Sequence, residues 1–279
     1  MNKRTMKQMT ALMKPLWNRI NDRLNRKQSQ RVILTYHGVS VGRQFNCIPR
    51  DLFREQIAWL KEHYTIVSLS NLIDSLNVPD VNQKDVVSIT FDDGYVNFAE
   101  LALPSLLEIG CHGTVFIPSG KAGHYNDWDE RRSDFVRMPL MSYDQLRNLP
   151  EDNVEIGSHG VTHSPINRLS YNEAVKEIVQ SRYDLEQNLG RAVRLLSFPY
   201  GGYPVMKGSD EGQTRQKVFG NYKGACTIRW GRYNSLREVY ALKRVGIWEH
   251  DTFEDFTDKL SGYYDWIAVK ENVARFITR

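Results

Sequence analysis

Cysteine is scarce in this sequence of 279 residues, and long apolar segments are absent from it. Its cysteines are three in number and far apart, without CxxC or zinc-finger spacing, at Cys47, Cys111 and Cys226. This spacing argues against a disulfide framework and predicts buried, reduced thiols. No apolar run approaches the roughly 20 residues of a membrane-spanning helix. No GxGxxG or P-loop fingerprint of a nucleotide site is present either.

An excess of basic over acidic residues is absent beyond the start of the chain. Residues 1–31 carry nine Lys or Arg and one Asp, whereas the whole chain has a net charge of +4, so residues 32–279 sum to −4. A mildly acidic body argues against nucleic acid as a partner. The composition, 41% hydrophobic and 25% charged, is that of a soluble globular protein with length for a full core.

The first thirty residues show no secretory signal, because their longest uncharged run, Gln8–Met13, is too short for its apolar part. Pro15 is expected to kink or divide this segment. Apolar residues recur there at spacings of three and four, among Lys and Arg: Met6, Met9, Met13, Leu16, Trp17, Ile20 and Leu24. This pattern predicts a basic amphipathic helix on an anionic membrane surface, and hence a cytoplasmic protein with peripheral contact to the inner membrane face. A helix docked across the end of the fold and a disordered leader are the alternatives.

From Arg31 onward, predicted strands and helices alternate. Strands are expected near residues 31–39, 64–69, 86–91, 113–118, 154–158, 193–198, 225–228 and 240–247. Helices are expected near residues 49–63, 70–76, 97–109, 142–149, 170–189, 212–219, 253–260 and 266–276, with a long loop at 120–140. Alternation of this kind indicates right-handed βαβ units and a parallel sheet. About seven units favour an irregular closed (β/α) barrel over a doubly wound sheet, as one domain at 31–279 with an extension at 1–30.

The stretch Val86–Gly94, VVSITFDDG, combines a buried-type strand with two carboxylates. Asp92 and Asp93 fall at the carboxyl end of the strand, where α/β folds place their active sites. Adjacent carboxylates repel, so a metal ion or a hydrogen-bond network is needed to hold them. The alternative is an Asp-Asp-Gly turn that closes a surface hairpin.

Two further strand ends carry unusual residues. SHGVTH contributes His159 and His163, which at a spacing of four would share one face of a helical turn. FPYG follows another strand at Phe198–Gly201. Two histidines with one carboxylate form a His₂Asp set that suits Zn²⁺ with open positions for water. Taken alone, HxxxH is more often two surface histidines.

TFDDGY at 90–95, SHGVTH at 158–163 and FPYG at 198–201, in this order, resemble the polysaccharide deacetylases of the NodB-homology type, carbohydrate esterase family 4. TYHGVS near the start and ACTIRWGRYN and LKRVGI near the end are similar to that family too. The resemblance covers about residues 31–250. It implies a distorted (β/α)7-type barrel and metal-dependent removal of an N-acyl group from an amino sugar.

Position by position, the resemblance implies that Asp93, His159 and His163 are metal ligands and that Asp92 is the general base. Tyr200 matches the residue whose backbone N–H helps to hold the oxyanion. The chemistry agrees with these roles, because a metal ion lowers the pKa of its bound water and a neighbouring carboxylate can take the proton. A backbone donor to the tetrahedral oxyanion commonly contributes about 3 kcal/mol.

The sequence departs from the family at two points. Ser197 stands where many members have an arginine that orients the base, and Arg244 or Arg194 are candidates to replace it. The late strand lacks the usual Leu-x-His, which leaves His250 as the candidate general acid there and His37, after the first strand, as a second. His250 could instead be a surface loop residue, and His37 a buried wall of the pocket.

The resemblance implies a metal-dependent N-deacetylase, most simply with Zn²⁺, that acts on a GlcNAc-type sugar of a surface polysaccharide or its lipid-linked precursor. A deformylase or O-acetyl esterase acting on a lipid-linked sugar is the first alternative. A non-catalytic carbohydrate-binding relative is the second. Trp230 is either a wall for the acetyl methyl or a core residue, and the loop residues Asn126, Trp128 and Arg131 are candidate sugar contacts.

Overall fold

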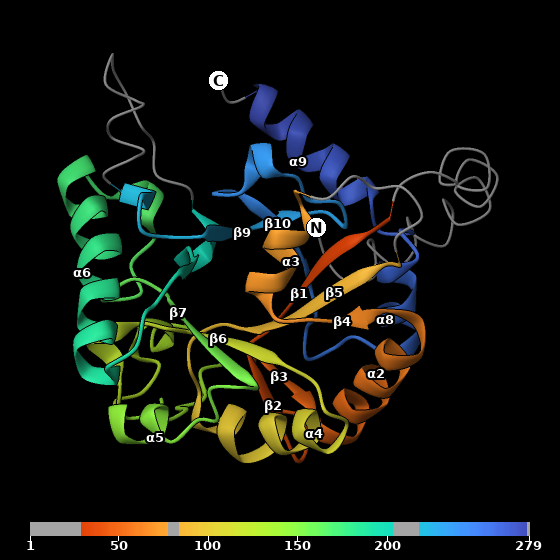
Figure 1. Ribbon diagram of the computed structural model, residues 1–279, viewed down its shortest axis with the longest axis horizontal. Coiled ribbons are helices and arrows are strands. Elements are labelled where there is room, and N and C mark those ends of the chain that lie inside the picture. Colours follow the sequence, from red (N-terminus) through yellow and green to blue (C-terminus); the bar gives the residue numbers. More distant parts are fainter. Residues whose placement is uncertain (1–28, 78–83, 203–217, 278–279) are drawn as a thin grey trace.

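The computed structural model describes residues 29–77, 84–202 and 218–277 and contains a closed parallel β-barrel surrounded by helices (Figure 1). The predicted N-terminal amphipathic helix and most of the helix predicted near 212–219 lie outside these residues. Within them, no helix has the length and apolar character needed to cross a membrane.

Seven strands form the barrel, in the order β1-β10-β9-β8-β7-β6-β5, and β5 pairs back with β1 to close it. All of these pairs are parallel, and β1 runs in register with β5 from Arg31 opposite Val86 to Tyr36 opposite Phe91. The strands are β1 (Arg31–Tyr36), β5 (Val86–Phe91), β6 (Gly113–Ile117), β7 (Val154–Ser158), β8 (Leu195–Ser197), β9 (Gly224–Trp230) and β10 (Leu242–Gly246). The predicted irregular (β/α)7 barrel is therefore confirmed.

Three short strands lie outside the ring. β4 (Thr65–Ile66) pairs with the outer side of β5, and β2 (Gly38–Ser40) pairs with β3 (Cys47–Pro49) in a separate small sheet. β2 begins two residues after β1 ends. The single strand predicted over 31–39 is therefore two strands, interrupted at His37.

Helices cover the outside of the barrel (Figure 1). They are α2 (Arg50–His63), α3 (Leu69–Ser75), α4 (Leu103–Glu108), α5 (Tyr143–Arg147), α6 (Tyr171–Leu189), α8 (Phe253–Leu260) and α9 (Trp266–Ile277). A π-helical turn at Phe98–Ala102 precedes α4 within the single helix predicted there. Ser170 caps α6 in a capping box and Gly190, at φ 68°, ends it. Ser68 caps α3, which begins at Leu69, one residue before the predicted start.

Aromatic side chains fill the core beneath the carboxyl ends of β1 and β5. Tyr36 and Phe91 stack at 5.4 Å, and Phe53 from α2 meets both edge-on at 5.3 and 5.8 Å. Each of these three side chains is fully buried. The last residues of β1 and β5 are therefore fixed by packing, which holds the start of the loops that follow these strands in one position.

Candidate metal centre and active site

Asp92 follows β5 directly, and its backbone N–H donates to the carbonyl of Tyr36 at 2.9 Å. Its buried carboxylate accepts two hydrogen bonds from the guanidinium of Arg244, at 2.8 and 2.7 Å. Arg244 is 2% exposed and also donates from Nε to the carbonyl of Thr227 at 2.8 Å. Burial raises the pKa of Asp92, but the charge and hydrogen bonds of Arg244, together with the nearby His159 and His37, outweigh it and hold that pKa below its usual value. Asp92 is therefore ionised at neutral pH and held in one orientation.

Asp93 and the two histidines of the second motif converge on one point. Oδ1 of Asp93 lies 3.1 Å from Nε2 of His163 and 3.5 Å from Nε2 of His159. All three side chains are buried, and one ligand atom from each lies within 4.8 Å of the others. One carboxylate oxygen and two imidazole nitrogens form a donor set that suits Zn²⁺ and similar ions.

The hydrogen bonds of His159 favour a cation at this point. Its Nδ1 lies 2.7 Å from the carbonyl of Ser197, so Nδ1 carries a proton. In the neutral ring Nε2 is then a bare acceptor, and it faces the acceptor Oδ1 of Asp93. A metal ion between these two atoms, or a proton on Nε2, removes the conflict. A metal-ligating histidine commonly donates its other N–H to a carbonyl in this way.

The pKa shifts of the two histidines differ in direction. Burial lowers the pKa of His159, but the negative charge of Asp92 and the bond to Asp93 outweigh it and raise that pKa. For His163, burial exceeds the influence of Asp93 and lowers the pKa. The neutral form that metal ligation requires is therefore the favoured form of His163.

Backbone strain is concentrated at this site. Among the described residues, four that are not glycine have positive φ, and three of them are Asp93 at 73°, His163 at 63° and Tyr200 at 55°. This left-handed conformation costs a residue with a Cβ about 1–2 kcal/mol. It replaces the helical turn predicted for HxxxH, because residues 159–165 form a loop. That prediction was wrong, although the two imidazoles do converge.

Helix α6 holds the loop between the two histidines. The backbone N–H groups of Val161 and Thr162 donate to the carboxylate of Glu177 at 2.8 and 3.0 Å. The Thr162 hydroxyl donates to the same carboxylate at 2.9 Å. One turn along α6, Ser181 Oγ donates to the carbonyl of Gly160 at 2.7 Å. Sequence reasoning did not find Glu177 or Ser181, because both are ordinary polar positions on a long amphipathic helix.

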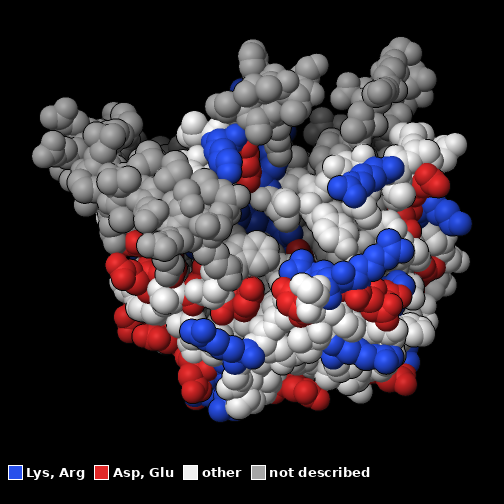
Figure 2. All heavy atoms as spheres, turned by 180° about the vertical axis from the view of Figure 1, so that it is seen from behind, with Lys and Arg blue, Asp and Glu red and all other residues white. Residues whose placement is uncertain are grey.

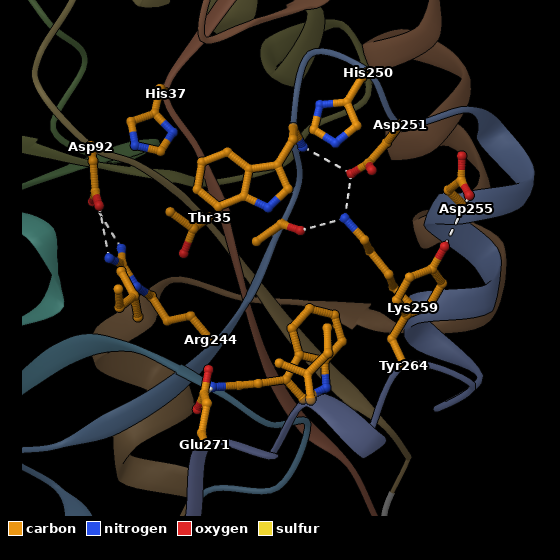
Figure 3. A pocket seen from close by; sticks show the side chains of 15 residues that line it. Thr35, His37, Asp92, Arg244, His250, Asp251, Asp255, Lys259, Tyr264 and Glu271 are labelled. Atoms are coloured by element: carbon orange, nitrogen blue, oxygen red, sulfur yellow. Dashed lines mark hydrogen bonds and ion pairs between the residues drawn. The ribbon is translucent and has the colours of Figure 1, made fainter. Parts of the chain in front are cut away.

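Both candidate general acids line one cavity, but they differ in their neighbours. His37, between β1 and β2, lines the same cavity as Asp92 and stacks on Trp248 with ring centres 5.4 Å apart (Figure 3). His250 lines the cavity near Asp251, and its Nδ1 lies 3.5 Å from a carboxylate oxygen of Glu249 (Figure 3). His37 is therefore the candidate placed beside Asp92.

Of the other residues predicted to contact the substrate, two lie against the ring of His163, one bonds only within its own loop and one is exposed. Tyr200 is half-exposed and meets the ring of His163 edge-on at 4.9 Å. Trp128 stacks on the other side of that ring at 4.0 Å. Asn126 is fully buried and bonds within its own loop, to the carbonyl of Val136 and the N–H of Met138, so it offers no sugar contact. Arg131, by contrast, is exposed.

The structure decides two of the open alternatives in the sequence. Arg244, not Arg194, stands in for the arginine missing from the third motif, since Arg194 is exposed near the amino end of β8. Trp230 is 7% exposed and its ring lines the cavity, while its Nε1 donates to Asp265 at 3.1 Å. It is thus both a buried residue and a wall of the site.

Charged side chains are mixed over the face of the molecule shown in Figure 2. Lys and Arg alternate there with Asp and Glu and do not gather into one basic patch.

Comparisons with known proteins support the family that the motifs resemble. The family model described as polysaccharide deacetylase matches residues 80–211. YxkH of Bacillus subtilis (strain 168), whose name places it in the same family, is 23% identical over 222 residues, which span 79% of this chain and 72% of YxkH. The Streptococcus pyogenes deacetylase PplD, solved in complex with acetate, is 20% identical with a TM-score of 0.66 over 83% of this chain and 98% of its own. IcaB from Ammonifex degensii is 17% identical with a TM-score of 0.66 over 85% and 98%.

Proposed function

Because this chain belongs to the polysaccharide deacetylase family, whose members hydrolyse amide bonds, we propose that it is a metal-dependent N-deacetylase. Its proposed substrate is a GlcNAc-type amino sugar of a cell-surface polysaccharide or of the lipid-linked precursor. One observation carries the proposal: the ligand atoms of Asp93, His159 and His163 converge within 4.8 Å, beside an aspartate held by a buried arginine.

Asp93, His159 and His163 would hold the metal ion, and Zn²⁺ suits their oxygen and nitrogen donors best. When bound, such an ion polarises the amide carbonyl and acidifies a water molecule at neutral pH. The chain itself fixes the ligands: the carbonyl of Ser197 sets the tautomer of His159, and Glu177 holds the loop that carries His163.

Asp92 is the proposed general base. Its depressed pKa keeps it ionised, and the hydrogen bonds from Arg244 to both of its oxygens fix the orientation of the carboxylate. His37 is the proposed general acid that protonates the leaving amine, because it lines the cavity together with Asp92. His250 is the second candidate for that role. The backbone N–H of Tyr200 is the proposed donor to the oxyanion.

Metal analysis combined with Asp92→Asn tests the proposal. We expect the purified protein to hold about one divalent ion, to release acetate from an N-acetylated glycan and to leave a free amine. Asp92→Asn should retain the metal but lose at least about 100-fold in kcat, the typical contribution of a general base. Release of formate, or of acetate without a new amine, would instead identify a deformylase or an O-acetyl esterase. A bound metal with no Asp92-dependent activity on any acylated sugar would indicate a binding protein.

Cellular glycans offer an independent test of the substrate. Structural analysis of the surface polysaccharide with and without this protein should reveal one amine that is acetylated only in its absence. If the two polysaccharides are identical in every acyl group, the proposed substrate class is wrong.

We also propose that residues 1–30, most of which lie outside the described residues, bring the protein to an anionic membrane surface. Their basic charge and apolar stripe support this. The full chain should sediment with vesicles that contain anionic lipid and should stay in solution with neutral ones. A chain without residues 1–30 that still sediments with anionic vesicles would contradict the proposal.

A further inference from the structure

A cavity of about 280 Å³ opens beside Asp92, between the ends of β9 and β10 and the helices α8 and α9 (Figure 3). Asp92, Arg244 and His37 lie at one side of it. Its walls are largely apolar, from Ile228, Trp230, Trp248, Tyr264 and Ile267. On the opposite side, Lys259 pairs with Asp251 and donates to the carbonyl of Gly246 at 2.8 Å.

The exposure of the lining residues shows which way the cavity faces. Ile228 is 57% and Trp248 37% exposed, whereas Lys259, Asp251 and Tyr264 are buried. Ile228, Trp248 and the exposed His250 therefore lie at the mouth, and the side chains of Lys259, Asp251 and Tyr264 form the inner end. Gly201, next to the proposed oxyanion donor Tyr200, packs against Ile228 so closely that a Cβ there would collide with it. The mouth thus adjoins the third motif.

The connectivity of an N-acylated polysaccharide decides which part of it can enter. A sugar inside a polymer has glycosidic bonds on two sides and needs an open groove. The acyl group is a terminal substituent, attached only through the carbonyl that Asp92 must approach. A cavity whose inner end is buried, and whose mouth lies beside Asp92, therefore suits the acyl group and not the sugar ring.

The volume of the cavity exceeds what an acetyl group needs. A water molecule in the liquid takes about 30 Å³, and a methyl or methylene group takes a similar volume. A cavity of 280 Å³ therefore has room for several carbons beyond the methyl of an acetyl group. Walls formed by two tryptophans, a tyrosine and two isoleucines suit such a chain.

One polar atom in the cavity is unsatisfied. Thr35 is 4% exposed and lines the cavity near Asp92, and its Oγ1 has no hydrogen-bond partner among the described residues (Figure 3). A buried hydroxyl without a partner is destabilising, so a ligand that supplies one is favoured. Four carboxylates and two basic side chains other than histidine line the cavity, which disfavours a chain that ends in a carboxylate: Asp92, Asp251, Asp255 and Glu271 against Arg244 and Lys259.

We infer that this cavity is an acyl-binding site for a neutral short-chain N-acyl group longer than acetyl, with a hydroxyl close enough to the carbonyl to reach Thr35. The inference rests on the proposed amide hydrolysis and names the acyl class that the same site prefers. A 3-hydroxybutyryl group has the required length and hydroxyl.

Binding of product acids tests the acyl site without knowledge of the sugar. The full-length, Zn²⁺-loaded protein is titrated calorimetrically with acetate, butyrate, 3-hydroxybutyrate and succinate. Burying one methylene changes affinity about fourfold, so butyrate should bind roughly 15-fold more tightly than acetate. The hydroxy acid should bind more tightly than butyrate, and succinate more weakly. Equal affinity for acetate and butyrate would overturn the inference.

Variants assign the preference to this cavity. Thr35→Val removes the hydroxyl at nearly constant volume and should abolish the advantage of 3-hydroxybutyrate over butyrate, while the matched Thr35→Ser keeps it. Ile267→Trp fills the cavity from α9 and should reduce the butyrate advantage to less than fourfold. Thermal unfolding checks that each variant is folded. If the advantages survive in folded Thr35→Val and Ile267→Trp, the acids bind elsewhere and the inference is wrong.

Hydrolysis of N-acetyl, N-butyryl and N-3-hydroxybutyryl glucosamine oligosaccharides separates this inference from the proposed function. A higher kcat/KM for the longer acyl groups supports both. Cleavage of the acetyl substrate at the highest kcat/KM refutes the acyl site and leaves the deacetylase standing. Failure to cleave any of them, with the predicted ranking of the acids, supports the acyl site and counts against the GlcNAc-type substrate.

Discussion

Arg244→Met should destabilise this protein far more than an arginine substitution on the neighbouring strand. The substitution keeps most of the aliphatic volume but removes both hydrogen bonds to Asp92, in a site where Arg244 is 2% and Asp92 4% exposed. Removing one partner of a buried ion pair costs about 3–5 kcal/mol, because the other charge stays buried. The carbonyl of Thr227 also loses a donor, at about 1 kcal/mol. The expected total is about 4–6 kcal/mol.

Urea unfolding of the metal-free protein, followed by far-UV circular dichroism, measures this loss. Arg229→Met is the matched control on β9, since Arg229 pairs with Glu238 at 3.2 Å with the two side chains 24% and 29% exposed. It should cost less than about 1 kcal/mol. Arg244→Lys keeps the charge and serves if Arg244→Met does not fold, because the loss of the paired geometry alone should lower stability measurably.

The refuting result is a cost below about 1.5 kcal/mol for Arg244→Met. A double-mutant cycle adds a second criterion. In an Asp92→Asn background no carboxylate charge is left unpaired, so Arg244→Met should cost at least about 2 kcal/mol less there. Equal costs in the two backgrounds would mean that Arg244 stabilises the barrel by packing and not by pairing with Asp92.

Three further predictions concern parts of the chain outside the ligand set. Glu177→Ala should weaken Zn²⁺ binding about 10- to 100-fold in a chelator competition, as loss of a supporting hydrogen bond does, whereas exposed Lys176→Ala should not change it. Lys243 and Arg229 outweigh burial and lower the pKa of Glu238. Glu238→Gln should therefore cost at most about 1 kcal/mol at pH 7. This difference should shrink as the pH falls below the ordinary glutamate pKa of about 4.3 and vanish once it has fallen through the lower pKa of Glu238 in the folded state. The thiols of Cys47, Cys111 and Cys226 are buried, and burial raises the pKa of each, to about 11 for Cys47 and about 12 for Cys226. Thiol reagents at neutral pH should therefore label these three cysteines slowly in the native protein and fully in the denatured protein.

Local sequence patterns were sufficient to predict the strands and helices that form the barrel. The run Val86–Phe91 is a strand with the predicted bounds, because its β-branched residues fit a position buried on both faces. Helix α6 (Tyr171–Leu189) agrees with the predicted range 170–189, because Ser170 caps its start and Gly190 its end. The three motifs therefore fall at carboxyl ends of parallel strands, and this topology alone brings them to one edge of the barrel.

Contacts between residues far apart in the sequence could not be predicted from local sequence patterns. Arg244 pairs with Asp92 across 152 positions of the sequence, and Arg194 was an equally good candidate until the register of β10 was known. The convergence of His159 and His163 depends on a left-handed backbone at His163, which no helical periodicity predicts. The cavity beside Asp92 depends on how α9 packs against Trp230, since Glu271 accepts the backbone N–H of that tryptophan at 3.1 Å. Tertiary packing decides each of these features.

The strained backbone at Asp93 and His163 predicts how metal removal will affect stability. Asp93 and His163 both have positive φ, and Nδ1 of His163 is buried without a partner among the residues described. At about 1–2 kcal/mol each, the two backbone conformations consume a substantial part of a typical stability of about 5–15 kcal/mol. They persist because the barrel fixes both ends of each loop, and a metal ion that binds only this folded arrangement offsets them.

Zn²⁺ at 100 times its dissociation constant should therefore raise the free energy of unfolding by about 2.7 kcal/mol, by mass action on the folded state. A chelator should reverse the gain in urea unfolding. His163→Gln, with a side chain of similar length but without the imidazole, should lose most of it, and His250→Gln, a histidine outside the convergent set, should keep it in full. An equal gain in His163→Gln and wild type would place the ion somewhere other than at Asp93, His159 and His163.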